Sequence, residues 1–162
     1  MKVETAGGFL AAMVALNEGP GFSPWYALAE LSRGVPWTLA VRMYLTLAES
    51  REVSEGVLGP AASIGKFPMG GECREVVVGV LRHWFFEQQH SPVVPENSWN
   101  VQEMVAESFV SMLEEVVGKA TISRITLSSL DPRLVESLLF TRKERSWLLH
   151  FGPAELREPF RA

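Results

Sequence analysis

The segment from Val101 to Val117 is the most strongly periodic part of the chain, and it constrains the fold more than any other feature. Its apolar residues recur at intervals of three and four, as on one broad face of an amphipathic α-helix. Asn100 and Glu103 resemble a capping box at the start of this helix. The face is wider than one small domain can cover, so we expect the C-terminal segment or a second copy of the chain to pack on it. Its residues are Met104, Val105, Phe109, Met112, Leu113 and Val116.

The N-terminal third predicts three shorter helices. The first spans Thr5–Asn17 and ends at a Gly-Pro-Gly run. The second begins at Ser23-Pro24, which supplies a capping hydroxyl and a proline at the first helical position, and ends at Gly34. The third runs from Pro36 to about Ser50 with an apolar stripe at four-residue spacing. The tight turn between the second and third helices is typical of a helix-turn-helix.

The rest of the chain alternates between short strands and helices. The predicted elements are two strands in Arg51–Gly71, a helix over Glu72–Gln89, a short strand or extended link over Thr121–Leu127, a helix from Asp131 to about Lys143 and a final strand over Trp147–Phe151. The two strands in Arg51–Gly71 would form the wing of a winged helix. We therefore expect a mostly α fold with a small β wing: a winged helix-turn-helix over residues 1–70, a linking helix and a dimerisation helix over 71–130, and a C-terminal helix and tail over 131–162.

Composition places the chain among ordinary globular proteins. It has 162 residues, of which 47% are hydrophobic and 21% charged, enough for one compact domain with its own core. Cys73 is the only cysteine, so neither an internal disulfide nor a site needing several thiolates can form. No apolar run reaches the ~18 residues that a membrane-spanning helix needs. The short apolar stretch Gly7–Leu16 makes a poor signal peptide, and we expect a cytoplasmic protein.

Several short motifs follow one another in a recognisable order. They are the opening Met1–Gly8, Leu28–Leu31 followed by Gly34–Pro36, then Val53-Ser54, Gly59-Pro60 and Phe67-Pro68, and finally Trp99–Glu115 followed by Ile125–Leu130. In this order the chain resembles the winged-helix family of iron–sulfur cluster regulators (IscR-type), nitric-oxide-sensing repressors and cysteine-metabolism repressors. The resemblance implies a repressor of transcription that binds double-stranded DNA at a palindromic operator and forms a homodimer through its long helix.

Two departures from this family are visible. Cluster-binding members carry three cysteines between the wing helix and the long helix, where this chain has none, so a cysteine-held iron–sulfur cluster is excluded. No other cofactor is indicated. Ala61-Ala62-Ser63 stands where the family's wing usually has a glycine pair and a tyrosine. The resemblance therefore implies a cluster-free member.

The resemblance also implies which residues would contact DNA. The helix Pro36–Ser50 would lie in the major groove, where polar or cationic side chains near its start read base edges. The predicted DNA-binding residues are Arg33, Trp37, Thr38, Arg42 and Lys66.

Charge gives this DNA interface little support. The whole chain has a formal net charge of −4. From Pro20 to Gly70 four cations face four glutamates, a balance of zero: Arg33, Arg42, Arg51 and Lys66 against Glu30, Glu49, Glu52 and Glu55. Clustered cations are the usual mark of a DNA-binding surface. The alternative hypothesis is a degenerate winged-helix protein that acts through a protein partner.

Cys73 is the one residue that suggests chemistry. It follows Gly70-Gly71-Glu72 at a predicted helix N-terminus, where the helix dipole lowers a thiol pKa. It could be a nucleophile paired with His83, His90 or His150, a redox-sensing thiol, or a small buried apolar residue. No aspartate is placed to orient a histidine, and the three histidines lack metal-ligand spacing with carboxylates. We therefore expect no enzymatic activity and no metal.

Overall fold

The computed structural model describes residues 3–21, 23–47, 64–69, 73–87, 99–127 and 133–153. Its elements in chain order are α1 (Val3–Asn17), β1 (Pro24–Glu30), α2 (Trp37–Leu47), β2 (Ile64–Pro68), α3 (Cys73–Arg82), the π-helix η1 (His83–Glu87), α4 (Trp99–Val117), β3 (Thr121–Leu127), β4 (Glu136–Arg142) and β5 (Arg145–Pro153). No helix in these ranges is both long enough and apolar enough to cross a lipid bilayer.

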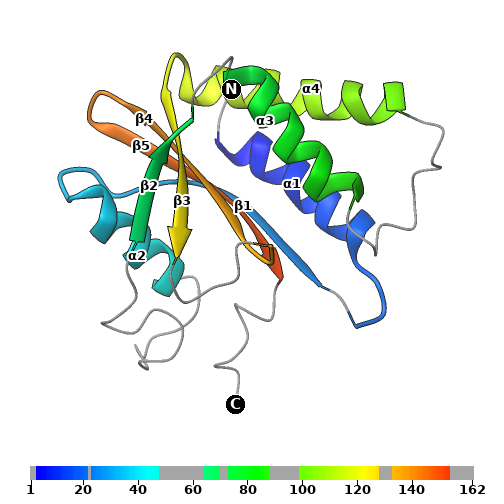
Figure 1. The fold of residues 1–162 in the computed structure, drawn as a ribbon, viewed down its shortest axis with the longest axis horizontal. Coiled ribbons are helices and arrows are strands. Elements are labelled where there is room, and N and C mark those ends of the chain that lie inside the picture. Colours follow the sequence, from blue (N-terminus) through cyan, green and yellow to red (C-terminus); the bar gives the residue numbers. More distant parts are fainter. Residues whose placement is uncertain are drawn as a thin grey trace.

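The described strands form one antiparallel sheet in the order β1-β5-β4-β3-β2 (Figure 1). β4 and β5 are joined by a two-residue turn, because Arg142 pairs with Arg145. Lys143 in this turn has a φ of 54°, as a tight hairpin with right-handed strand twist requires. β1 lies at one edge of the sheet and begins with Pro24, a position where the missing N–H is tolerated.

Helices cover both faces of this sheet (Figure 1). α1, α3, η1 and α4 pack on one face, and α2 packs on the other. Successive residues of β5 show the two environments, since Trp147 and Leu149 belong to the first core and Leu148 to the second, and all three are 0% exposed. The sheet is therefore the middle layer of three.

The predicted winged helix-turn-helix is wrong. Helices are present near the predicted positions at α1, α2 and α4, but Pro24–Glu30 is a strand where the motif needs its first helix. Tyr26 and Leu28 face one core while Trp25 faces the other, so this strand is buried on both sides and its sequence does not alternate between apolar and polar residues. The protein has an α/β fold with a five-stranded antiparallel sheet, in place of a mostly α winged helix.

The wing and the C-terminal helix also differ from expectation. β2 pairs with β3 of the same sheet, so it is an edge strand of the central layer. Residues 51–63, the other part of the predicted wing, lie outside the described residues. The segment predicted as a helix to Lys143 contains the strand Glu136–Arg142. The predicted strands at Thr121–Leu127 and Trp147–Phe151 are confirmed within β3 and β5. The strands β2, β3, β4 and β5 thus belong to one sheet.

Candidate functional site

An apolar cleft opens between α3, the C-terminal half of α4 and the strands β3 and β4. Its volume is about 530 Å³, within the range of small-molecule sites. The apolar side chains that line it are each at most 8% exposed: Val77, Val110, Leu113, Val117, Ile122 and Phe140. The charged lining residues Arg74, Glu114 and Lys119 are more exposed and lie at its mouth. The cleft therefore combines an apolar depth with a charged rim.

The end of α4 shapes this mouth. Gly118 follows the last helical residue with a φ of 65°, and its N–H donates to the Glu114 carbonyl oxygen at 2.8 Å. This left-handed glycine cap stops the helix and turns the chain toward β3. A Cβ atom at Gly118 would lie 2.5 Å from Nη1 of Arg142, so glycine also leaves room for that guanidinium beside the helix end. The next lining residue along the chain after Lys119 is the small Ala120.

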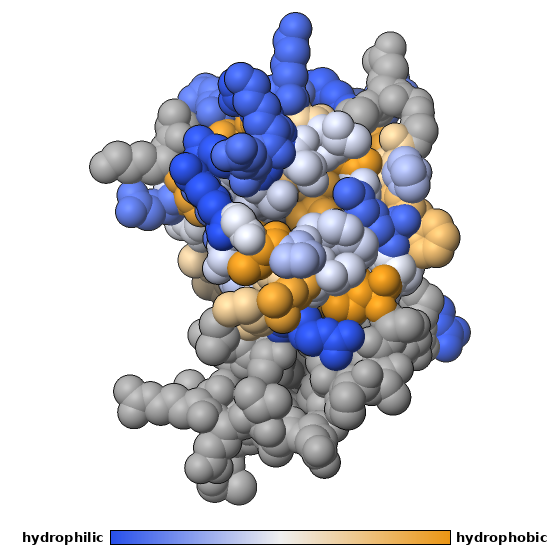
Figure 2. Space-filling view, turned by 90° about the vertical axis from the view of Figure 1, so that its left-hand side faces the viewer, coloured by the Kyte–Doolittle hydropathy of each residue, from blue (hydrophilic) through white to orange (hydrophobic). Residues whose placement is uncertain are grey.

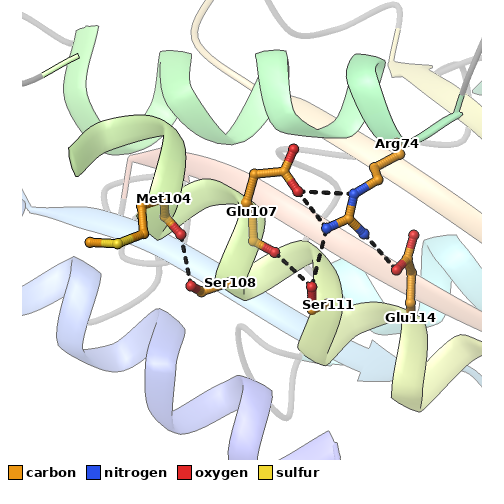
Figure 3. A network of polar contacts seen from close by, with 6 residues as sticks. All are labelled: Arg74, Met104, Glu107, Ser108, Ser111 and Glu114. Atoms are coloured by element: carbon orange, nitrogen blue, oxygen red, sulfur yellow. Dashed lines mark hydrogen bonds and ion pairs between the residues drawn. The ribbon is translucent and has the colours of Figure 1, made fainter. Parts of the chain in front are cut away.

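Arg74 bridges α3 and α4 across the mouth (Figure 3). Its Nε donates to Glu107 Oε2 at 2.9 Å, and its Nη2 donates to the same oxygen and, at 3.1 Å, to Ser111 Oγ. Its Nη1 donates to Glu114 Oε2 at 2.6 Å. The hydrogen bonds that Arg74 donates to Glu114 and Glu107 raise its pKa, so it stays protonated. The guanidinium is thus held between two carboxylates that lie about two turns apart on one face of α4.

The described lining carries binding groups and no histidine, cysteine or serine. The described residues also contain no group of three or more histidine, cysteine or carboxylate side chains placed to hold a metal ion. What the cleft offers is an apolar volume, one guanidinium with planar donor geometry, one ammonium group and one carboxylate. These groups suit recognition of a molecule with an apolar body and a polar end.

A second polar feature lies on the opposite face of the sheet. His150 Nδ1 and Ser137 Oγ are 2.8 Å apart, and both residues are at most 2% exposed. The ring centroids of Trp25 and His150 lie 4.3 Å apart. The Nε2 atom of His150 is buried and has no hydrogen-bond partner among the described residues. Burial lowers the pKa of His150 to about 3. This histidine is therefore neutral and closed off from solvent.

The predicted pairing of Cys73 with a histidine is not visible. Cys73 begins α3, and its side chain lies outside the described part, as does His90. His83 is exposed and lies 3.3 Å from Glu87. The sheet stands between α3 and His150, since α3 packs on one face and Trp25, the neighbour of His150, on the other.

The predicted DNA-binding residues are only partly brought together. Lys66 Nζ lies 5.4 Å from the ring centroid of Trp37, on the α2 side of the sheet. Thr38 and Arg42 are half-buried on α2. Arg33 is exposed and binds Glu30 at 3.0 Å, and that carboxylate also binds Arg145 at 2.9 Å.

The predicted dimerisation face lies mainly within the protomer. Phe109 and Leu113 are 0% and 1% exposed because this side of α4 faces α1, η1 and the sheet. Val105, Met112 and Val116 are half-buried against the same core. Met104 alone of the six is exposed, at 61%. The assignment of Phe109 and Leu113 to a subunit contact is therefore corrected. Of the two covers expected from the sequence, the structure shows the C-terminal segment, whose strands β3, β4 and β5 pack in the same core.

The sequence analysis did not identify the contacts of Arg74 with Glu107, Ser111 and Glu114. The sequence indicates part of this arrangement, because these three residues recur at intervals of four and three along α4 and so share one face. Nothing local indicates that this face meets α3, since Arg74 is 33 and 40 residues away from the two glutamates.

Comparison with known proteins gives no relative from which to transfer a function: no family model, no curated protein and no solved structure matches this chain.

Proposed function

We propose that this domain is a binding protein that takes a small, largely apolar molecule into the α3–α4 cleft and performs no chemistry on it. The observation that carries the proposal is the cleft itself, whose apolar lining is buried and whose few polar groups converge at the mouth. A well-formed apolar pocket with a few convergent polar groups is the usual form of a ligand site. A cytoplasmic location belongs to the same proposal and agrees with a single cysteine.

The proposal is tested by filling the cleft. Ala120→Phe places a ring in the lining, and Ala12→Phe places the same ring at an exposed position of α1 that does not line the cleft. Binding of the uncharged fluorophore phenylnaphthylamine is followed by its emission. We expect Ala120→Phe to weaken binding by about tenfold or more while Ala12→Phe binds like the wild type. Circular dichroism checks that both variants fold. Equal binding by all three proteins would remove the cleft as the site.

A protein partner is a second candidate, and the outer surface of α2 favours it. Leu39 and Met43 are one helical turn apart and are 45% and 36% exposed. Figure 2 views the side on which α2 and β2 lie in Figure 1, and hydrophobic surface is interspersed there with hydrophilic surface. Solvent-exposed apolar side chains at this spacing suit contact with another protein better than contact with phosphates. Binding of DNA by the five residues predicted from the sequence stays a prediction.

The two hypotheses for the α2 surface, binding of a protein partner and binding of DNA, predict that different variants lose binding. We expect Leu39→Ser with Met43→Ser to weaken the affinity for a purified protein partner by about tenfold. Arg33→Ala with Arg42→Ala should leave that affinity within about twofold of the wild type. Fluorescence anisotropy with double-stranded DNA at stated salt is measured on the same proteins. Salt-dependent DNA binding lost only in the arginine variant would favour the DNA-binding regulator.

A further inference from the structure

We propose that the ligand of the α3–α4 cleft is an amphipathic carboxylate: an unbranched aliphatic chain lies in the apolar depth, and its carboxylate binds Arg74 in place of Glu114. This inference rests on the proposed function and names the chemical class of the ligand. Three observations carry it: the lining of the depth, the unequal attachment of Arg74 to its two glutamates, and the charges around the end of α4.

The depth of the cleft suits an aliphatic chain. Its lining consists of branched aliphatic side chains and one phenylalanine, contributed by α3, α4, β3 and β4. Val110, Leu113 and Phe140 are at most 2% exposed, so a methylene chain in the cleft packs against apolar side chains of the core. Each methylene transferred into such surroundings tightens binding by about fourfold. No described lining residue of the depth offers a hydrogen bond to a polar group there, so the polar end of a ligand must stay at the mouth.

The mouth already shows how a carboxylate is recognised. Arg74 contacts Glu107 through both Nε and Nη2, which donate to the same oxygen, Oε2, and its Nη2 also donates to Ser111 on the same helix. It contacts Glu114 through Nη1 alone, and the Glu114 side chain is 53% exposed. Exposed single ion pairs contribute little stability. A ligand carboxylate can therefore take the position of the Glu114 carboxylate while Glu107 keeps the guanidinium in place.

The surrounding charges favour an anion over a cation at this position. Lys119 also lines the cleft, and the guanidinium of Arg142 lies next to Gly118 at the end of α4. A cationic head group at the same position would lie against the guanidinium of Arg74, whose positive charge repels it. Exchange of one exposed glutamate for a ligand carboxylate breaks a single hydrogen bond. A ligand with an anionic head group is therefore favoured over a ligand with a cationic one.

The experiment compares three ligands of equal chain length: decanoate, decanol and decyltrimethylammonium. Each is titrated into the full chain by calorimetry below the concentration at which it forms micelles. We expect decanoate to bind about tenfold more tightly than decanol and decyltrimethylammonium. Across saturated carboxylates of increasing length, affinity should rise by about fourfold per methylene until the cleft is filled.

Two variants with opposite expected effects test the exchange at Arg74. Arg74→Met keeps an unbranched side chain without charge and should weaken decanoate binding by about tenfold, leaving decanol unchanged. Glu114→Gln removes the competing carboxylate and should tighten decanoate binding by several-fold. A purely structural role of the ion pair would not produce changes of opposite sign. Thermal unfolding of each variant confirms that it is folded.

The outcomes separate this inference from the proposed function. If the three ligands bind equally and Ala120→Phe weakens all of them, the carboxylate inference is overturned and the cleft remains a binding site. If decanoate binding is unaffected by Arg74→Met and Glu114→Gln, the exchange at Arg74 is overturned. If none of the ligands binds the wild type and phenylnaphthylamine does not bind either, the inference and the proposed function fall together.

Discussion

Between pH 7 and pH 5 the free energy of unfolding is expected to fall by roughly 2 kcal/mol because His150 is buried in its neutral form. Burial lowers the pKa of this histidine from 6.5 to about 3 in the folded protein. The unfolded chain therefore takes up a proton near pH 6.5, whereas the folded protein takes it up only near pH 3. In this window the unfolded state binds more protons, so stability is lost as the pH falls.

Urea unfolding at closely spaced pH values measures this effect. The window above pH 5 separates the effect of His150 from that of Glu30. The hydrogen bond to Arg145 lowers the pKa of Glu30 to about 2, so its contribution is lost only as the pH falls below its ordinary value of 4.5. His150→Asn keeps a polar atom near the position of Nδ1 for Ser137 and does not titrate. This variant is less stable than the wild type at pH 7 and should lose little further stability by pH 5.

A matched control uses the exposed histidine of η1. His83→Gln removes an exposed imidazole that lies 3.3 Å from Glu87 and leaves the buried His150 in place, so the loss of stability that His150 causes between pH 7 and pH 5 should persist in this variant. Parallel stability curves for the wild type and His150→Asn would show that the buried imidazole does not govern acid sensitivity.

Helical periodicity predicted the helices of this fold well. α1, α2 and α4 each place apolar residues at intervals of three and four, and each packs that face on the sheet. For α2 and α4 the local pattern is enough, because each remains amphipathic where it covers one face of the sheet. The limits of α4, Trp99–Val117, agree with the predicted helix to within two residues.

The strands were harder to predict because the sheet is covered on both faces. In β4, Leu138 and Phe140 face the α1–α3–α4 layer while Leu139 faces α2, which produces an apolar run without alternation. β1 contains two alanines, a leucine and a glutamate, which favour a helix, and Ser23 followed by Pro24 at its first position is typical of a helix start. Pairing with β5 and burial on both sides outweigh these local preferences.

Local pattern indicated only the shared face of Glu107, Ser111 and Glu114 at the candidate site, and not the cleft itself. Its lining comes from α3, α4, β3 and β4, and the cleft exists only when these elements are in place. The broad apolar face of α4 correctly predicted that other structure packs on this helix. Sequence spacing does not distinguish a sheet of the same chain from a second subunit as the packing partner. The burial of Phe109 provides a direct test of that distinction.

Replacing Phe109 with alanine is expected to lower the free energy of unfolding by about 3–5 kcal/mol, the usual cost of removing a large side chain from a core. The ring is 0% exposed, and its centroid lies 5.2 Å from that of Phe9 and 6.0 Å from that of Phe85. The variant loses the transfer energy of the ring and leaves a cavity between α1, η1 and α4 that these elements can only partly close.

Met104→Ala is the matched control, since it shortens a side chain on the same helix that is 61% exposed. We expect it to change the free energy of unfolding by less than about 0.5 kcal/mol. Urea unfolding measures both variants, and sedimentation equilibrium over a range of concentrations measures their mass. A core position predicts a large loss of stability for Phe109→Ala at every protein concentration. If this variant instead has half the mass of the wild type and an unchanged unfolding midpoint, Phe109 lies between subunits, and the placement of α4 against its own sheet is wrong.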